Sequence, residues 1–328
     1  MKSSVAKILL IRLLSSLVVL FLLISSIFIL LRIAPGDPVL KFVSQEFSSE
    51  LADKVRLSFH LNGSISDQYL AFVRNMISGD FGISYNYHLP VLSVIGNYLL
   101  FTLLFSSICF TVQIVFSYKL AITVYNKKGR LLDKALSGIA LVAYSIPGFV
   151  TATILIYIFS IGFHILPSSG FTSINFDELS MLEKIFDYFK HLVLPVATLS
   201  LSSMVIFYKY LRDNFDTVSK KSFVIFLRTL GLDENEILKE HIVPNSVGPL
   251  ISVAGVQLGM LLSGSLITEV IFGLPGMGRL TVNAILLRDY PLVVGCAFIS
   301  GVMVILSNFI ADLLKAKIDK RLLKDILN

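Results

Sequence analysis

Residues Leu99–Tyr118 read LLFTLLFSSICFTVQIVFSY, 20 consecutive residues without an acidic or basic side chain. A helix of about 20 apolar residues is long enough to cross the hydrocarbon core of a bilayer. Backbone groups in lipid must find their hydrogen-bond partners within the segment, so this run is predicted to be a membrane-spanning helix. This stretch alone places the chain among membrane proteins.

The rest of the sequence agrees with that prediction. Over all 328 residues, 55% are hydrophobic and 15% are charged, whereas soluble proteins carry about 25% charged residues. This composition excludes a soluble globular enzyme and a disordered chain. We therefore predict an all-α polytopic membrane protein with six transmembrane helices. The five further runs without Asp, Glu, Lys or Arg are Leu13–Leu31, Ala135–Gly162, Leu192–Tyr208, Ser246–Thr268 and Tyr290–Ala311.

Small residues and prolines inside these runs predict how the helices pack. Pro147 and Pro195 are expected to kink the third and fourth helices. Gly255 and Gly259 form a small-xxx-small pattern, which favours a close approach between two helices.

The positive charges predict the orientation. The N-terminal segment, the loops 119–134 and 209–245 and the segment from 312 hold 19 Lys and Arg residues, and the alternate loops hold 9. Loops rich in Lys and Arg stay on the cytoplasmic side, so both termini are predicted to be cytoplasmic. The excess of Lys and Arg, which gives the chain a net charge of +6, is thus explained by its topology in the lipid bilayer. No nucleic-acid partner is needed to explain this charge.

Three regions follow from these spans. Residues 1–31 form the cytoplasmic N-terminus and first helix, 32–92 an extracytoplasmic loop or cap, and 93–328 a five-helix core with a cytoplasmic loop at about 212–245. The cap is expected to contain an amphipathic helix that Ser66 or Asp67 starts and Gly79 ends, and a shorter helix over Ser49–Leu57. The first helix is predicted from the helical spacing of Tyr69, Phe72, Val73, Met76 and Ile77.

The cytoplasmic loop 212–245, called the elbow below, is predicted to fold as two short helices. Phe223, Phe226, Leu227 and Leu230 have the spacing of one apolar helix face. Gly231 is expected to end this helix in a left-handed conformation. The spacing leaves two interpretations open: a docking face for another protein, or a helix that lies on lipid.

Capping residues predict the second helix of the elbow. Asp233 is expected to start it, with Glu236 completing an arrangement similar to a capping box. Pro244 is expected to end it before the next span.

Catalytic and ion-coupling chemistry is missing from the six runs. They contain no Asp, Glu, Lys, Arg or His, which are the usual residues of proton relays and ion-coupled sites in membranes. GLPGMGRL at residues 273–280 has the outline of a phosphate loop, but Arg279 and Leu280 replace the required Lys and Ser or Thr. We expect no catalytic residue and no metal or nucleotide site in this chain.

Four blocks in order resemble one family from end to end. They are APGDPV at 34–39, GDFGIS at 79–84, the elbow with Gly231 and Pro244, and EVIFGLPGMGRL at 269–280 followed by RDYP at 288–291. The chain resembles the membrane permease subunits of ATP-binding-cassette (ABC) importers, in the oligopeptide, dipeptide and nickel branch. The positions that carry the family motifs are Pro35, Gly36, Asp37, Pro38, Gly79, Asp80, Gly82, Glu269, Pro275, Gly276, Gly278, Arg279, Asp289, Tyr290 and Pro291.

The resemblance implies a type I ABC importer permease in the bacterial cytoplasmic (inner) membrane. Such a subunit pairs with a second homologous permease, two cytoplasmic ABC ATPases and an extracytoplasmic solute-binding protein. The ATPases use the ATP, so this chain is not expected to be an enzyme or to bind a cofactor itself. Peptides are the expected cargo, nickel or another small solute is the alternative, and an ion-gradient carrier is a more distant one.

The resemblance also favours a protein over lipid as the partner of the elbow. The family's Glu-Ala-Ala positions in this loop are occupied by Ile225, Phe226 and Leu227. The residues expected to form the ATPase-coupling loop are Phe223, Phe226, Leu227, Arg228, Leu230, Gly231, Leu232 and Pro244.

Overall fold

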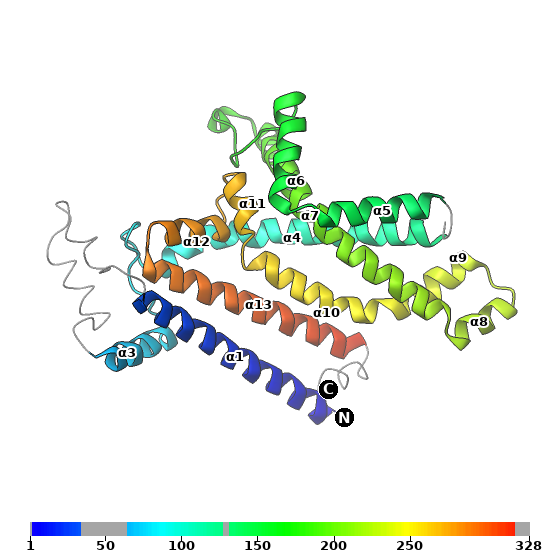
Figure 1. Cartoon of the computed structure of the whole chain (residues 1–328), viewed down its shortest axis with the longest axis horizontal. Helices are drawn as coiled ribbons and strands as arrows, with labels where there is room; N and C mark the ends of the chain where they lie inside the picture. Colours follow the sequence, from blue (N-terminus) through cyan, green and yellow to red (C-terminus); the bar gives the residue numbers. More distant parts are fainter. Residues whose placement is uncertain (1, 34–63, 127–130, 319–328) are drawn as a thin grey trace.

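A computed structural model describes residues 2–33, 64–126 and 131–318, and helices dominate all three parts (Figure 1). Each of the five candidate spans coincides with one of the apolar runs identified in the sequence, and only Leu31 of the first run lies beyond its span. The helices that form them are α1 (Lys2–Ile33), α4 (Val91–Asn126), α7 (Met181–Ser219), α10 (Val243–Leu262) with the short helices on either side of it, and α13 (Tyr290–Ile318).

The third run is not one straight helix, which confirms the break predicted at Pro147. The helix α5 (Leu131–Ser145) ends just before Pro147, and α6 (Gly148–Leu155) starts just after it. The two are bent by 104°, so this run adds a sixth span only if the bent pair crosses as one. A residue that precedes proline disfavours the helical conformation, which explains why the chain breaks here. In contrast, α7 runs through Pro195 as one helix.

The fifth run is also divided. Gly264, with φ of +104°, separates α10 from the short helix α11 (Leu266–Ile271), and α12 (Met277–Leu286) follows. The segment 269–289, one of the alternate loops in the count of Lys and Arg, packs against the bundle. The backbone amide of Met277 donates to Thr102 Oγ1 of α4 over 2.8 Å.

The bundle is built from two close helix pairs. The helix α4 lies along α7, and α10 lies along α13, while α1 packs on α13 and α5 on α7. A Cβ at Gly255 would lie 2.4 Å from the Cβ of Ala311, and Ser307 Oγ donates to the carbonyl of Gly255 over 2.7 Å. Gly259 faces Val304 in the same way. The close approach predicted from Gly255 and Gly259 is therefore confirmed.

The two ends of the bundle carry different short elements. At the end opposite the elbow, α3 (Ile65–Ile77) packs on α1, with the rings of Phe28 and Phe72 4.9 Å apart (Figure 1). Its cap is Ser64, which forms a capping box with Asp67, so the helix starts two or three residues before the predicted cap, Ser66 or Asp67. The proposed helix Ser49–Leu57 and the motif residues Pro35, Gly36, Asp37 and Pro38 lie outside the described residues.

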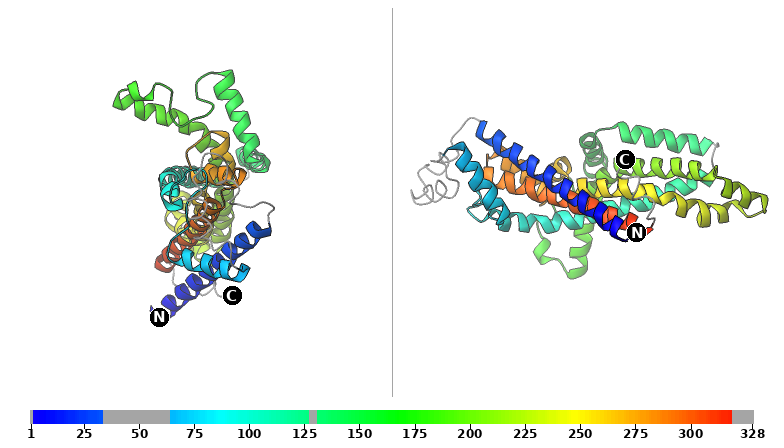
Figure 2. Two further views of the ribbon diagram at one scale, coloured as in Figure 1. Left: turned by 90° about the vertical axis from the view of Figure 1, so that its left-hand side faces the viewer. Right: turned by 90° about the horizontal axis from the view of Figure 1, so that it is seen from below.

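The remaining elements form a projecting arm and the elbow. The π-helical turn η2 (Ile156–Gly162) extends α6, and with the first part of α7 it projects from the bundle on the side opposite α1 (Figure 2). The 3₁₀ turn η3 (Phe176–Glu178) lies in the connecting loop. The elbow contains α8 (Ser222–Thr229), α9 (Glu234–Glu236) and the π-helical η4 (Ile237–Ile242).

Candidate functional site

The first helix of the elbow, α8, has two apolar faces. Val224 is fully buried and Leu227 is half-buried, and both pack on a core cluster that α4, α5, α7, η4 and α10 share. Phe223, Phe226 and Leu230 are 39%, 61% and 59% exposed. The four residues expected on one face are thus divided. We call Phe223, Phe226 and Leu230 the apolar row.

Gly231 ends α8 in the left-handed conformation that the sequence predicts, with φ of +80°. Its amide donates to the carbonyl of Arg228 over 3.0 Å, and the amide of Leu232 donates to the carbonyl of Leu227 over 3.4 Å. This pair of bonds is the Schellman motif. A Cβ at Gly231 would meet no atom within 4 Å, so the need for glycine comes from the backbone conformation alone.

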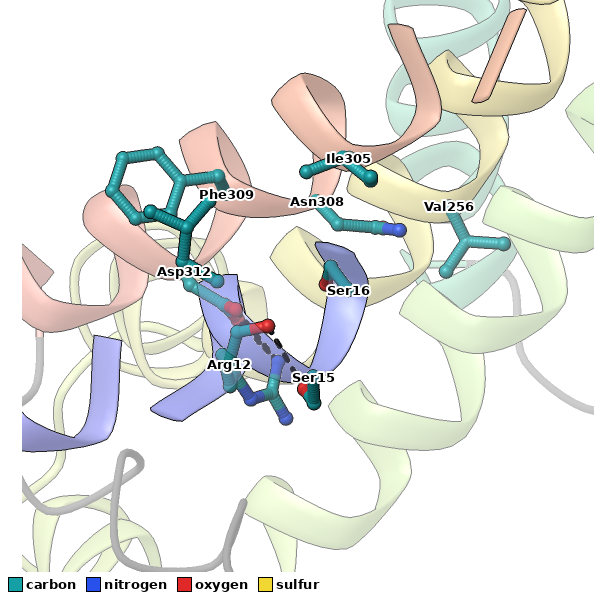
Figure 3. A pocket seen from close by; sticks show the side chains of 9 residues that line it. Arg12, Ser15, Ser16, Val256, Ile305, Asn308, Phe309 and Asp312 are labelled. Atoms are coloured by element: carbon teal, nitrogen blue, oxygen red, sulfur yellow. Dashed lines mark hydrogen bonds and ion pairs between the residues drawn. The ribbon is translucent and has the colours of Figure 1, made fainter. Parts of the chain in front are cut away.

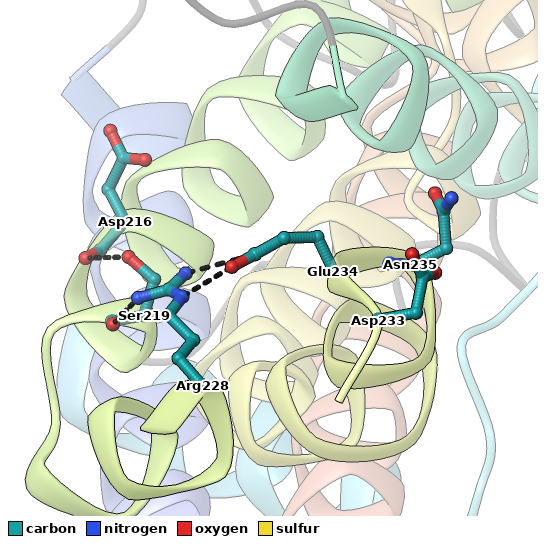
Figure 4. Close-up of polar contacts among 6 residues, drawn as sticks. All are labelled: Asp216, Ser219, Arg228, Asp233, Glu234 and Asn235. Carbon is teal, nitrogen blue, oxygen red and sulfur yellow. Dashed lines mark hydrogen bonds and ion pairs between the residues drawn. The ribbon is translucent and has the colours of Figure 1, made fainter. Parts of the chain in front are cut away.

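Arg228 ties the pieces of the elbow together (Figure 4). Its Nε and Nη2 donate to the two carboxylate oxygens of Glu234 over 2.6 and 3.1 Å. Its Nη1 donates to the carbonyl of Ser219, at the end of α7, over 3.1 Å. The hydrogen bond to Glu234 is the main cause that raises the pKa of Arg228 above its ordinary value. Three donors of this side chain therefore act within the chain, joining α7, α8 and α9.

The second half of the elbow differs from the sequence expectation at two points. Asp233 starts α9 as predicted, but its carboxylate accepts from the amide of Asn235 over 2.9 Å and forms an ordinary cap (Figure 4). Pro244 does not end the helix, because η4 leads directly into α10 and Pro244 stands in its first turn. The wider π-helical turn, in which Val243 donates to Leu238, makes room for a proline ring.

Glu269 explains most of the glycine-rich motif at 269–280. Its carboxylate is fully buried and accepts from the backbone amides of Ser265 over 3.1 Å and of Arg279 over 2.9 Å. Arg279 is the third residue of α12, so Glu269 caps that helix from the side. A Cβ at Gly276 would lie 2.4 Å from this carboxylate, and one at Gly278 2.9 Å from it. Both glycines are therefore required by space.

The remaining contacts of this motif fix the turn that precedes α12. The guanidinium of Arg279 donates to the carbonyl of Gly273 over 2.6 Å. Pro275 lies in the same turn, between α11 and α12.

Asp289 has the same role at the start of α13. It is fully buried, and its Oδ2 accepts from Ser84 Oγ over 2.5 Å and from the backbone amide of Asn86 over 3.0 Å. Its Oδ1 accepts from the amide of Leu292, the third residue of α13, over 3.3 Å. The carboxylate thus joins the hairpin 82–90 to the helix.

The other motif residues shape this hairpin and the start of α13. Gly79 and Gly82 both have φ of +76°, and Asp80 Oδ1 accepts from the amide of Gly82 over 2.9 Å. Tyr290 packs its ring edge against Tyr85 with 6.4 Å between centroids, and Pro291 follows it in the first turn of α13.

The structure brings the predicted residues together at two places, the elbow and the opposite half of the bundle. Of their partners, Ser84 is the last residue of the block at 79–84, whereas Thr102, Asn86 and Glu234 were not identified from the sequence. Each is a common polar residue far from the motif that it holds, except Glu234, which follows Arg228 by six positions. Only that short spacing of opposite charges could have indicated a contact.

Comparisons with known proteins agree with this arrangement. Residues 113–324 match the family described as binding-protein-dependent transport system inner membrane component, and residues 5–106 match its N-terminal membrane component. The oligopeptide transport system permease AppB of Bacillus subtilis is 30% identical and covers 90% of this chain and 92% of its own. The nickel import system permease NikB of Staphylococcus aureus is 29% identical, with coverages of 97% and 92%.

A solved structure supports the fold. The inward-facing methionine ABC transporter MetNI includes a chain that aligns with a TM-score of 0.53 at 14% identity, and the alignment covers 70% of this chain and 97% of that one. From the family match and the relatives, the chain belongs to the binding-protein-dependent transport system inner membrane components and is a permease subunit of a type I ABC importer.

Proposed function

We propose that the elbow couples this permease to a cytoplasmic ABC ATPase through the apolar row. The observation that carries the proposal is the exposure of Phe223, Phe226 and Leu230 on a helix whose other face is packed in the core. The Schellman turn and the bonds of Arg228 hold the row in a fixed position, as force transmission requires. ATP is bound and hydrolysed by the partner ATPases, and this chain supplies no catalytic group.

The proposed orientation places the elbow in the cytoplasm and α3 outside. It is supported by the 19 Lys and Arg residues on the elbow side of the sequence against 9 on the other. We place the protein in the bacterial cytoplasmic membrane, because the family that it matches is described as an inner membrane component and the relatives come from bacteria. In this orientation the hairpin 82–90 and α3 face a solute-binding protein, and a second homologous permease completes the pathway.

Short peptides are the proposed cargo, because the oligopeptide permease of Bacillus subtilis resembles the chain over nine tenths of its length. Nickel is the second candidate, because the nickel permease of Staphylococcus aureus is nearly as similar. Uptake of a labelled short peptide and of labelled nickel, in cells with and without this chain, separates the two. Loss of peptide uptake alone supports the first, and loss of nickel uptake alone supports the second.

The energy source needs its own control. We expect uptake to persist when the proton and sodium gradients are dissipated while ATP is preserved. Uptake that collapses with a gradient in the presence of ATP contradicts an importer and indicates a gradient-driven carrier.

The docking claim is tested at Phe226. Phe226→Glu places a charge in the middle of the apolar row, and we expect the ATPase no longer to co-purify with the permease. Phe226→Leu keeps an apolar side chain and is the matched control, expected to retain the ATPase. Full co-purification with a correctly inserted Phe226→Glu variant would contradict docking through the row. If Phe226→Glu instead releases the elbow from lipid while the ATPase stays bound, the first helix of the elbow lies on the membrane.

A further inference from the structure

A cavity of about 410 Å³ lies between α1, α10 and α13, near the beginning of α1 and the end of α13 (Figure 3). It exists because α1 packs mainly on α13, which leaves space between α1 and α10. Neither the elbow nor the motif carboxylates reach it. Its role is therefore independent of the contacts described above.

The lining changes from charged to apolar along the direction of the helices. Asp312, Asn308 and Ile305 follow one another along one face of α13, over about 10 Å at the rise of an α-helix. On α1, Arg12 lies beside Asp312, and Ser16 follows one turn on (Figure 3). The cavity thus has a charged end, a polar middle and an apolar end.

One cation and one anion line the charged end, and a second cation lies near them. Arg12 Nη1 donates to both oxygens of Asp312, over 2.8 and 2.6 Å, and the carboxylate is buried. Lys315, three residues after Asp312, does not line the cavity, but it is buried and close enough to both side chains to interact with them electrostatically. A second cation thus lies near the ion pair. The ion pair uses only Nη1 of Arg12, and the side chain is about one third exposed. Its other N–H groups can therefore still donate to an added anion.

The polar middle offers unused hydrogen-bonding groups. Asn308 is half-buried, and its amide makes no hydrogen bond within the part of the chain that the structure describes. The hydroxyl of Ser16 is in the same situation among the described residues. Polar side chains inside a span are costly unless they find a partner, so their placement around a cavity indicates that a ligand satisfies them.

We propose that this cavity binds the headgroup of an anionic phospholipid. The phosphodiester lies against Arg12, the ester oxygens accept from Asn308 and Ser16, and an acyl chain leaves past Ile305 and Val256. A phospholipid has this same order of charge, polar ester and hydrocarbon along the bilayer normal. Basic pockets between helices near the membrane surface are the usual sites for such headgroups.

Native mass spectrometry of the purified full-length chain tests the proposal. The delipidated protein is titrated with phosphatidylglycerol and, separately, with phosphatidylcholine. We expect one phosphatidylglycerol to be retained in preference to phosphatidylcholine. Arg12→Gln should weaken phosphatidylglycerol binding about fivefold, the effect of one basic side chain. Lys7→Gln removes an exposed charge from the same helix and should leave binding unchanged.

Two further variants test the direction of the charge effect and the need for space at the apolar end. Asp312→Asn removes the competing anion, so phosphatidylglycerol should bind more tightly, opposite to the effect of Arg12→Gln. Val256→Phe fills the apolar end and should weaken binding while leaving the ion pair of Arg12 and Asp312 intact. Thermal unfolding of each variant in detergent shows whether it is folded.

Three results would overturn the proposal. Equal retention of both lipids, insensitive to Arg12→Gln, would mean that only ordinary surrounding lipid is bound. Displacement by glycerol 3-phosphate as effective as by phosphatidylglycerol would mean a soluble-anion site. Burial of the Arg12 face by a second permease, with no lipid retained, would mean that a protein fills the space.

Discussion

The elbow and the motif segments at the other half of the bundle use opposite means to hold a backbone in place. In the elbow, a glycine in open space and one partly exposed ion pair set the conformation, and the apolar row is left exposed. Around α12 and α13, the fully buried carboxylates of Glu269 and Asp289 accept from backbone amides of four different segments. One region leaves hydrophobic surface uncovered, and the other satisfies its polar groups internally.

The difference indicates where the chain can yield. A buried carboxylate with several donors fixes one geometry, because any shift leaves a charge or a donor without a partner. In the elbow, Arg228 joins α8 and α9 to the end of α7 and Val224 packs on the core, so a displacement of the elbow would move the end of α7 with it. We therefore expect substitutions near Glu269 and Asp289 to affect folding, and substitutions in the elbow to affect coupling.

The largest effect is expected for Gly278→Ala. The added Cβ would lie 2.8 Å from the backbone nitrogen of Leu266 and 2.9 Å from the Glu269 carboxylate, so two helices must separate. Overpacking of this kind costs about 3 kcal/mol, and thermal unfolding in detergent measures it. The control is Gly96→Ala, because its Cβ would meet no atom within 4 Å. Equal stability of the two variants would contradict the role given to Glu269.

Asp289→Asn should have the next largest effect. The amide can replace only one acceptor oxygen, so it places a donor against Ser84, Asn86 or Leu292. Loss of this buried bonding costs about 2 kcal/mol, and it should appear as faster hydrogen exchange in residues 82–90. Asp80→Asn is the control, because the amide of Gly82 can still donate to its oxygen. Unchanged exchange in Asp289→Asn would show that the hairpin is held by other contacts.

Gly231→Val tests the elbow through its backbone. A side chain at φ of +80° costs about 1–2 kcal/mol, although its Cβ would meet no atom, so the chain should still insert and fold. We expect ATP hydrolysis to continue in the assembled transporter while uptake is lost. Gly231→Asn is the control, since asparagine tolerates this conformation better than valine. Full uptake by a well-expressed Gly231→Val variant would contradict coupling through this turn.

The sequence predicts the spans and the first turn of the elbow because both depend on local rules. An uncharged run of 17 to 28 residues requires a helix in lipid, and a glycine after an amphipathic run indicates a left-handed end. Spacing could not show that Val224 rather than Phe226 faces the core. The two neighbouring faces of α8 are both apolar. Which of them is buried depends on where α7 and η4 lie.

The packing of the segment 269–289 against the bundle could not be predicted, for a different physical reason. Counting charges assigns a segment with Glu269, Arg279 and Asp289 to water, because an isolated carboxylate is costly in a bilayer. In the fold, backbone amides at the starts of α11, α12 and α13 receive the two carboxylates. No local pattern reveals that donors from Ser84 and Asn86, some two hundred positions away, converge on Asp289.

The smallest effect is expected from Glu234→Gln. It removes the charge that Arg228 pairs with, but a partly exposed pair contributes less than about 1 kcal/mol, and salt screens it. Hydrogen exchange across 222–236 should rise modestly at low salt and match the wild type at high salt. Glu236→Gln, two residues on and exposed, is the control and should change nothing at either salt concentration. An effect of Glu234→Gln that persists at high salt would show that geometry, and not charge, fixes the elbow.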